Sequence, residues 1–204
     1  MSIWLDRLTA LFEEGHRREV SGLMSDERFA VADRTADAAV LIAITDRKKP
    51  GVLLTQRPND MRDHPGQVAF PGGKIDPGED AITAALREAH EEIALDPAHV
   101  TVIGTTDRYQ TGTGFDVTPV LGIVPPDVTA TLVANPTEVA SWFEAPLELV
   151  LNRANFTEQE VFWRGAMRRY LEMDYEGYRI WGVTAAIIAN LSRRIDAERL
   201  FNAD

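Results

Sequence analysis

The chain contains no cysteine, no long apolar run and comparatively little positive charge. With no cysteine among 204 residues, disulfide bonds and thiolate metal sites are excluded. No apolar stretch approaches the roughly 20 residues that a membrane-spanning helix requires. The 32 aspartates and glutamates outnumber 21 lysines and arginines, giving a formal net charge of −11. Neither a nucleic-acid backbone nor an anionic membrane is therefore expected as a partner.

The remaining composition is typical of a globular protein. Hydrophobic residues make up 45% of the chain, whose length suits one domain with its own core. Residues 1–6 lack the basic flank and cleavage pattern of a secretory signal, so a cytoplasmic location is expected. The net charge still allows a small phosphorylated substrate, because a metal ion and a few arginines determine the local field in a cleft.

A helix is predicted between residues 81 and 95 because apolar residues recur there at spacings of three and four. These positions are Ile82, Ala85, Leu86, Ala89 and Ile93. Asp96-Pro97 ends the segment. Glu88, Glu91 and Glu92 fall within an arc of about 100° on a neighbouring face of this helix.

Three neighbouring carboxylates indicate a cation site, because a cation would supply the opposite charge that they need. Like charges this close raise one another's pKa and need bulk water or a cation to remain ionised. Carboxylate oxygens suit Mg²⁺ or Mn²⁺ better than zinc. Taken alone, glutamates on a surface helix more often form a solvated face. The longer pattern around them favours the metal site.

That longer pattern begins at Gly73, continues after five residues with Glu79, and after seven more with residues 87–95, Arg-Glu-Ala-His-Glu-Glu-Ile-Ala-Leu. It resembles the Nudix box, the signature of hydrolases that cleave a nucleoside diphosphate linked to another group. Ala94 departs from it, because the family usually has glycine there. Alanine favours a right-handed conformation, which leaves the exit from the helix open.

The resemblance implies a role for each charged residue of the box. Glu88 and Glu92, four residues apart, are expected to bind Mg²⁺ or Mn²⁺ directly, with Glu91 as a ligand or base. Glu79 is expected at the helix start, where the dipole favours a carboxylate, orienting Arg87 or a metal-bound water. Arg87 is expected to form a salt bridge that joins the loop to the helix.

A second conspicuous stretch, residues 53–73, lies directly ahead of the box and resembles the additional motif of the coenzyme A pyrophosphatase branch of this family. The residues that agree are Leu53, Leu54, Thr55, Arg57, His64, Gly66, Phe70, Pro71, Gly72 and Gly73. Met61 replaces a usual leucine and keeps its volume and polarity. Pro58 replaces a usual serine, which removes a hydroxyl and a backbone donor and leaves a different substrate preference open.

Coenzyme A carries a diphosphate and a ribose 3′-phosphate, so its pocket should contain several cationic donors. The guanidinium fork of arginine suits phosphate groups. The residues predicted to bind substrate are Arg57, Arg62, His64, Phe70, Gly72 and Gly73. Without the motif, the arginines would be interpreted as surface charges and His64 as a capping or structural histidine.

Downstream, residues 135–139, Asn-Pro-Thr-Glu-Val, resemble a segment of the same branch that turns a glutamate toward the metal site. Glu138 is therefore expected to be an outer metal contact or the general base. The glycine-rich tip of residues 107–116 is interpreted as a turn rather than a ligand loop. Trp181 could stack on an adenine, but core packing is the favoured interpretation.

The remaining patterns predict alternating strands and helices. Strands are expected at residues 38–45, 52–56, 100–105, 117–124, 160–164 and 168–173. Three further helices are expected. The first covers residues 3–12, the second starts after Pro146, and the final one closes at Arg193-Arg194. His16 is expected to be solvated. The first helix should pack on the domain or on a second subunit, which leaves a homodimer open.

The resemblance implies an α/β Nudix fold, a mixed sheet sandwiched between helices. Residues 1–34 are assigned to an N-terminal helical extension and 35–195 to a single catalytic domain. The implied reaction is metal-dependent hydrolysis of coenzyme A, or of a derivative, to 3′,5′-ADP and 4′-phosphopantetheine. Two alternatives are hydrolysis of another substrate, such as NADH, ADP-ribose or a nucleoside triphosphate, and a catalytically silent nucleotide-binding module.

Overall fold

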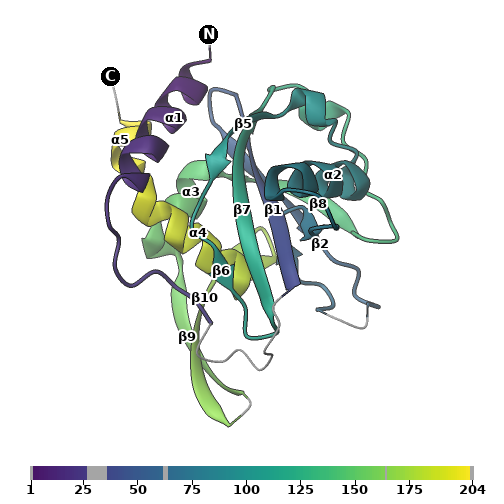
Figure 1. Cartoon of the computed structure of the whole chain (residues 1–204), viewed down its shortest axis with the longest axis vertical. Helices are drawn as coiled ribbons and strands as arrows, with labels where there is room; N and C mark the ends of the chain where they lie inside the picture. The colour runs from purple at the N-terminus through teal and green to yellow at the C-terminus, as the bar shows by residue number, and fades with distance from the viewer. Residues whose placement is uncertain (1, 27–35, 62–63, 164, 203–204) are drawn as a thin grey trace.

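The computed structural model describes residues 2–26, 36–61, 64–163 and 165–202 (Figure 1). Within these ranges the chain folds into an eight-stranded mixed sheet, a three-stranded antiparallel sheet and flanking helices. The predicted α/β class and the sandwich of a mixed sheet between helices are confirmed.

The centre of the large sheet is a parallel pair, β1 (Ala36–Thr45) and β7 (Phe115–Val124), which are in register along their whole length. Both strands are partly exposed at their N-terminal ends and almost wholly buried toward their C-terminal ends. Alternate residues of β1 pack on opposite faces, with Leu41 in one apolar cluster and Ile42 in the other. Burial on two faces explains why the sequence reads as a continuous apolar run rather than an alternating one.

Six shorter strands complete the large sheet around this pair. They are β2 (Gly51–Gln56), β3 (Val68–Ala69), β4 (Gly72–Lys74), β5 (Thr101–Thr105), β6 (Tyr109–Gln110) and β8 (Ser141–Pro146). The main path runs β3-β2-β1-β7-β5, while β4 pairs with β1, β6 with β7 and β8 with β2.

Helices cover the two faces of this sheet unequally (Figure 1). Helix α2 (Ala81–Ile93) packs on one face through its apolar side. The other face is covered by α1 (Ile3–His16), α3 (Leu147–Leu151), α4 (Val183–Arg194) and α5 (Ala197–Phe201). None of the helices in the described ranges is both long enough and apolar enough to cross a membrane.

The three-stranded sheet consists of β9 (Thr157–Trp163), β10 (Ala166–Tyr175) and β11 (Tyr178–Trp181), and its β9–β10 hairpin projects from the body (Figure 1). The two strands predicted here are confirmed over the described residues, and residue 164 lies outside these. Strand β9 begins before residue 160, and β10 extends beyond 168–173 at both ends. The sequence of β11 was interpreted as the approach to the final helix. It forms a strand because it pairs with β10 while Ile180 is buried and Tyr178 stacks on Phe143, with ring centroids 3.7 Å apart.

The N-terminal helix is confirmed and packs on helices of the same chain. Ser2 caps it, its hydroxyl accepting from the backbone N–H of Leu5 at 3.0 Å. The expectation that His16 is solvated was wrong. Its half-buried ring lies with Nδ1 2.7 Å from the Phe12 carbonyl oxygen and Nε2 2.9 Å from the Thr106 hydroxyl. The helix end thus joins the start of the β5–β6 connection.

Candidate active site

Three carboxylates from distant parts of the sequence meet beside helix α2. Glu88, Glu92 and Glu138 each place an oxygen within 4.8 Å of the others. Glu88 and Glu92 lie one turn apart on α2, while Glu138 comes from the loop before β8. Asn135 holds this loop, because its backbone N–H donates to the Glu92 carbonyl at 2.8 Å and its side-chain amide donates to Glu138 at 3.1 Å.

The electrostatics of this carboxylate cluster favour a bound cation. Glu92 is only 7% exposed. Burial raises the pKa of Glu92 to about 8, and the adjacent Glu88 and Glu138 act in the same direction, while the Gly72 N–H and Arg57 oppose them. Burial also raises the pKa of Glu88. An ion placed among the three oxygens would compensate both the burial and the mutual repulsion.

The donor set fits Mg²⁺ or Mn²⁺. All three side chains of the carboxylate cluster offer hard oxygen ligands, and the sequence contains no cysteine. Glu88 and Glu92 could therefore hold the ion directly, and Glu138 is close enough to be a further ligand or an outer contact.

Arg87 connects the glycine-rich loop to helix α2, as predicted. Its Nε and Nη2 donate to the two carboxylate oxygens of Glu79 at 2.8 and 3.0 Å, and Nη2 also donates to the Lys74 carbonyl at 3.0 Å. Its Nη1 donates to Glu88 at 2.9 Å and to Glu91 at 3.0 Å. One guanidinium therefore fixes the loop, the helix and a member of the carboxylate cluster.

The structure does not place Glu91 with Glu88 and Glu92 as expected. The side chain of Glu91 is 48% exposed and is paired with Arg87. Helical spacing limited these residues to a broad arc, within which Glu91 is the more exposed residue and shares Arg87 Nη1 with Glu88. Glu138 takes the third position in the carboxylate cluster because the fold brings a distant loop to α2.

Glu79 lies close to its predicted position at the helix start, although the cap is its neighbour. Asp80 caps α2, accepting from the Thr83 N–H at 2.7 Å. The carboxylate of Glu79 accepts from the Asp76 N–H at 3.0 Å and from Arg87. These bonds lower the pKa of Glu79 and keep it ionised as the partner of the guanidinium.

Helix α2 ends at Ile93, and the residue that caps it, Ala94, is in a left-handed conformation with φ 55° and ψ 29°. The Ala94 N–H donates toward the Ala89 and His90 carbonyls, closing the helix in the way that glycine usually does. The exit that the sequence left open is therefore the usual left-handed one. A side chain in this region costs about 1 kcal/mol or more, and the buried Leu95 that follows offsets part of that cost.

Gly72 and Gly73 bring the backbone of β4 against the carboxylate cluster. The Gly72 N–H donates to Glu92 Oε2 at 3.2 Å. A Cβ atom added at Gly73 would lie 2.5 Å from the carboxylate of Glu88. The absence of a side chain at Gly73 is thus what allows Glu88 to reach the cluster.

Replacing Gly73 with alanine should displace Glu88 and lower kcat/KM by about 10- to 100-fold, the range typical of a disturbed metal environment. Steady-state kinetics and thermal melting would measure the effect. Gly177→Ala is the control, since its φ of 85° strains any side chain but no atom lies within 4 Å. It should lower the melting temperature and leave kcat/KM unchanged. A fully active Gly73→Ala variant would contradict the tight approach of Glu88.

Gly72 and Gly73 also line a cavity of about 680 Å³. Five of the predicted substrate residues line it, namely Arg57, His64, Phe70, Gly72 and Gly73. The sixth, Arg62, lies outside the described residues. Apolar side chains of β1, β7 and α4 form much of the remaining wall. Gly72 therefore belongs both to the cavity and, through its bond to Glu92, to the carboxylate cluster.

Arg57 is a cation of the cavity wall that has an unused donor. In the described part of the chain its Nε is buried and has no hydrogen-bond partner. It also lowers the pKa of Glu92, which places its charge within reach of the carboxylate cluster. His64 is exposed at the cavity edge in a left-handed conformation with φ 55°, a strain often found at functional positions.

Sequence reasoning missed part of the cavity wall. The segment of residues 107–116 does turn, but it also contains β6, and its Thr111 and Thr113 line the cavity. The apolar Val183 and Ile187 of α4 contribute as well. Threonines in a glycine-rich turn carry no distinctive pattern, so the sequence offered no signal for their position.

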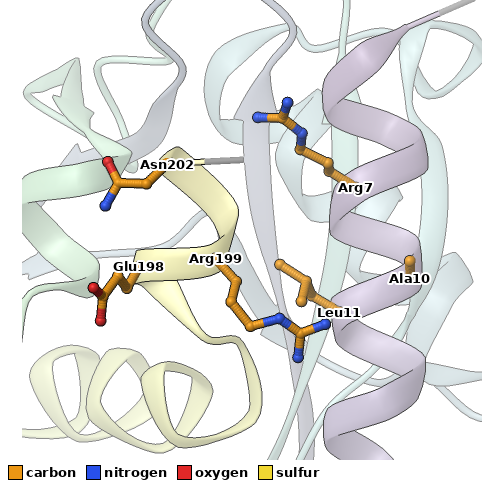
Figure 2. A pocket seen from close by; sticks show the side chains of 6 residues that line it. All are labelled: Arg7, Ala10, Leu11, Glu198, Arg199 and Asn202. Atoms are coloured by element: carbon orange, nitrogen blue, oxygen red, sulfur yellow. The ribbon is translucent and has the colours of Figure 1, made fainter. Parts of the chain in front are cut away.

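A second cavity, of about 500 Å³, lies between α1 and α5 and is distinct in its lining (Figure 2). Its arginines are engaged in holding the two ends of the chain together. Arg7 Nη1 donates to the Leu200 carbonyl at 3.2 Å, and Arg199 donates twice to Glu14 at 2.7 and 2.9 Å. This arrangement indicates a structural role.

A carboxylate cluster beside a cavity that contains Arg57 is the arrangement expected of a metal-dependent hydrolase. The NUDIX domain family model matches residues 35–164. Proteins named "Uncharacterized Nudix hydrolase NudL" from Enterobacter sp. (strain 638) and Escherichia coli (strain K12) are each 46% identical over 159 residues, spanning 78% of this chain and 82% of the relative. The chain therefore belongs to the Nudix hydrolase family. Its members act on nucleoside diphosphate derivatives and generally use divalent metals such as Mg²⁺ or Mn²⁺.

Solved structures give a weaker likeness. An Ap4A hydrolase of C. elegans has a TM-score of 0.47 and 27% identity, over 56% of this chain and 82% of its own. The Nudix hydrolase RenU of M. smegmatis has a TM-score of 0.47 and 26% identity, over 64% and 83%. Because both scores fall below 0.5, the family assignment rests on the sequence matches.

Proposed function

We propose that this Nudix hydrolase cleaves the diphosphate of coenzyme A or of a derivative. The products are 3′,5′-ADP and 4′-phosphopantetheine, or its acyl form. The observation that carries the proposal is the position of Gly72, which lines the cavity beside Arg57, His64 and Phe70 and also donates to Glu92. A diphosphate at Gly72 would lie between the carboxylate cluster and the predicted phosphate-binding side chains.

In this proposal Glu88 and Glu92 hold the divalent cation, and Glu138 is an outer contact or the general base. When bound, the ion would neutralise phosphoryl oxygens and increase the acidity of water. Hydrolysis forms one P–O bond from water, breaks one anhydride P–O bond and requires a carboxylate to accept a proton. Glu138 is suited to that role because Asn135 orients it toward the site. Exposed Glu91 remains the alternative base.

Arg87 and Glu79 support this chemistry without contacting substrate. Their paired charges keep the loop that carries Gly73 against the helix that carries Glu88. The geometry of the carboxylate cluster is then set before substrate arrives, which is where much of the advantage of a catalytic site originates.

Arg57→Ala should raise KM for coenzyme A by about 10- to 100-fold, the loss expected for one charge-assisted bond to phosphate. The metal concentration that gives half-maximal activity should change much less than KM, because Arg57 is not one of the three clustered carboxylates, although its charge acts on Glu92. Initial rates over a matrix of substrate and metal concentrations would measure both quantities. Exposed Arg153→Ala is the matched control and should behave as wild type. An unchanged KM in Arg57→Ala would remove the phosphate role.

A different substrate is the principal alternative, and Pro58 is the feature that favours it. The Pro58 carbonyl accepts from the Gly66 N–H at 3.3 Å and the Met61 N–H at 3.4 Å, so it shapes the loop that carries His64. Relative kcat/KM values for coenzyme A, NADH, ADP-ribose and a nucleoside triphosphate test the assignment. The proposal expects coenzyme A to be preferred. A preference for one of the other three compounds would make that compound the assigned substrate. Absence of metal-dependent turnover of all four would favour a catalytically silent binding module.

A further inference from the structure

Three side chains form a layered cation–aromatic cluster on one face of β10 and β11. The guanidinium carbon of Arg179 lies 4.7 Å from the ring centroid of Trp181 and 6.0 Å from that of Tyr170. The two rings meet edge to face, with centroids 5.6 Å apart. We call Tyr170, Arg179 and Trp181 the β10–β11 platform. Trp181, expected in the core, is only half-buried here, so that interpretation was wrong.

The guanidinium of the platform is held in one orientation. Arg179 Nε donates to Glu172 Oε2 at 2.8 Å, Nη2 donates to the Tyr170 hydroxyl at 3.1 Å, and Nη2 is also paired with Glu172. The Arg179 side chain nevertheless remains 53% exposed. An ordered, planar cation lying on an indole and still open to solvent provides a flat surface for a second planar group.

This arrangement differs from ordinary core packing on the same strands. Tyr178 and Ile180 alternate with Arg179 and Trp181 along β11, and it is Tyr178 and Ile180 that join the core. Ordering a long arginine side chain on a partly exposed surface costs conformational entropy. A ligand that stacks on the guanidinium would make use of that order.

The β10–β11 platform is close in sequence to two parts of the cavity wall. Trp181 is separated by one residue from Val183, which lines the cavity. Arg168, two residues before Tyr170, lies against the 111–113 turn: a Cβ atom added at Gly112 would be 2.5 Å from its Nη2. Thr111 and Thr113 of that turn line the cavity. Residues within two positions of Trp181 and of Tyr170 therefore line the cavity or lie against its wall, while the platform residues themselves are not part of the lining.

We propose that the β10–β11 platform binds the nucleobase of the substrate, which stacks on the outer face of the Arg179 guanidinium above Trp181. This inference rests on the proposed function of the cavity, where the diphosphate would be bound. Stacking accepts any base π-face, so the platform supplies affinity for the nucleotide half and little discrimination among bases. The residues are positioned to act on binding, not on the chemical step.

The chain offers a matched control on the opposite face of β10. Arg169 is also an exposed arginine, paired with Glu158 at 3.5 Å and Glu160 at 2.9 Å. It differs from Arg179 in that no ring contact is found for it in the described part of the chain. Arg169→Ala therefore removes a comparable surface ion pair without touching the β10–β11 platform.

The test is calorimetric binding of 3′,5′-ADP and of inorganic pyrophosphate to the full chain with Mn²⁺, in wild type, Arg179→Ala, Arg179→Lys, Trp181→Leu and Arg169→Ala. The three platform variants should bind 3′,5′-ADP about 5- to 50-fold more weakly, and all proteins should bind pyrophosphate equally. Arg179→Lys keeps the charge without the planar group and is the variant to interpret if alanine impairs folding. Circular dichroism would verify folding.

Unchanged 3′,5′-ADP affinity in Arg179→Lys and Trp181→Leu, or an equal loss in Arg169→Ala, would overturn the platform proposal. Coenzyme A turnover is measured in parallel. If coenzyme A is not cleaved but the base-dependent loss is seen, the substrate assignment fails and the platform stands. If coenzyme A is cleaved with unchanged KM in the platform variants, the platform fails and the substrate assignment stands.

Discussion

Replacing Glu92 with glutamine is expected to reduce kcat by about 1,000-fold or more while the protein stays folded. Glu92 is the most buried member of the carboxylate cluster and accepts the Gly72 N–H. An amide of the same shape can keep that hydrogen bond but provides no charge for the cation. A bound metal ion lowers the activation free energy by several kcal/mol through charge stabilisation, and each step of about 1.4 kcal/mol changes the rate tenfold.

The same substitution should not destabilise the metal-free protein. Burial raises the pKa of Glu92, which means that its surroundings disfavour the ionised carboxylate. A neutral amide avoids this cost, so the melting temperature in chelator should equal or exceed that of wild type. The stabilisation that added Mn²⁺ gives wild type should be largely lost.

Glu91→Gln is the comparison for Glu92→Gln. Both glutamates lie in the same turn of α2, but Glu91 is 48% exposed and is paired with Arg87 outside the carboxylate cluster. Its substitution should lower kcat by a much smaller factor and leave stabilisation by Mn²⁺ largely intact. Equal losses in the two variants would contradict the assignment of Glu138 in place of Glu91.

Arg87→Ala is expected to have the largest combined effect on stability and activity. It leaves Glu79 and Glu88 without their principal partner, and these side chains are only 17% and 15% exposed. The free energy of unfolding should fall by about 2 kcal/mol, less than for a fully buried pair because part of the network reaches solvent. Activity should fall by about 100-fold as Glu88 loses its orientation.

Urea unfolding and steady-state kinetics would measure these effects. Arg87→Lys restores a charge but not the fork that joins Glu79 to the Lys74 carbonyl, so it should recover stability only in part. Arg17→Ala is the control, because its pair with Glu13 is exposed at 76% and 57% and should contribute little. Wild-type stability and activity in Arg87→Ala would mean that the network is not required.

Local pattern was sufficient to predict the central elements of the fold. Helix α2 follows from apolar residues at helical spacing, and β1 and β7 from apolar runs that two layers of helix bury. Strand β8 was missed because Ser141 and Glu144 interrupt its apolar pattern. It forms through pairing with β2, from Gly51 opposite Pro146 to Gln56 opposite Ser141. Such pairing is tertiary and leaves little trace in a short segment.

The sequence predicted the site residues that belong to its motifs, and not those that tertiary packing adds. The pairing of Arg87 with Glu79 follows from charges that loop and helix bring together, and Glu138 was predicted by resemblance rather than by spacing. The choice between Glu91 and Glu138 could not be made from the sequence, because it depends on how the 135–139 loop closes on α2. The cavity residues Thr111 and Val183 are likewise brought in by tertiary packing.

Product analysis would show whether the chain cleaves the diphosphate of coenzyme A. The purified chain would be incubated with coenzyme A in Mg²⁺, Mn²⁺ or chelator, and the products separated by chromatography, with Glu92→Gln as the inactive control. We expect equal amounts of 3′,5′-ADP and 4′-phosphopantetheine from the wild-type protein with Mg²⁺ or Mn²⁺, and neither product with chelator or from Glu92→Gln. Intact coenzyme A under conditions in which another nucleoside diphosphate derivative is cleaved would contradict the substrate assignment.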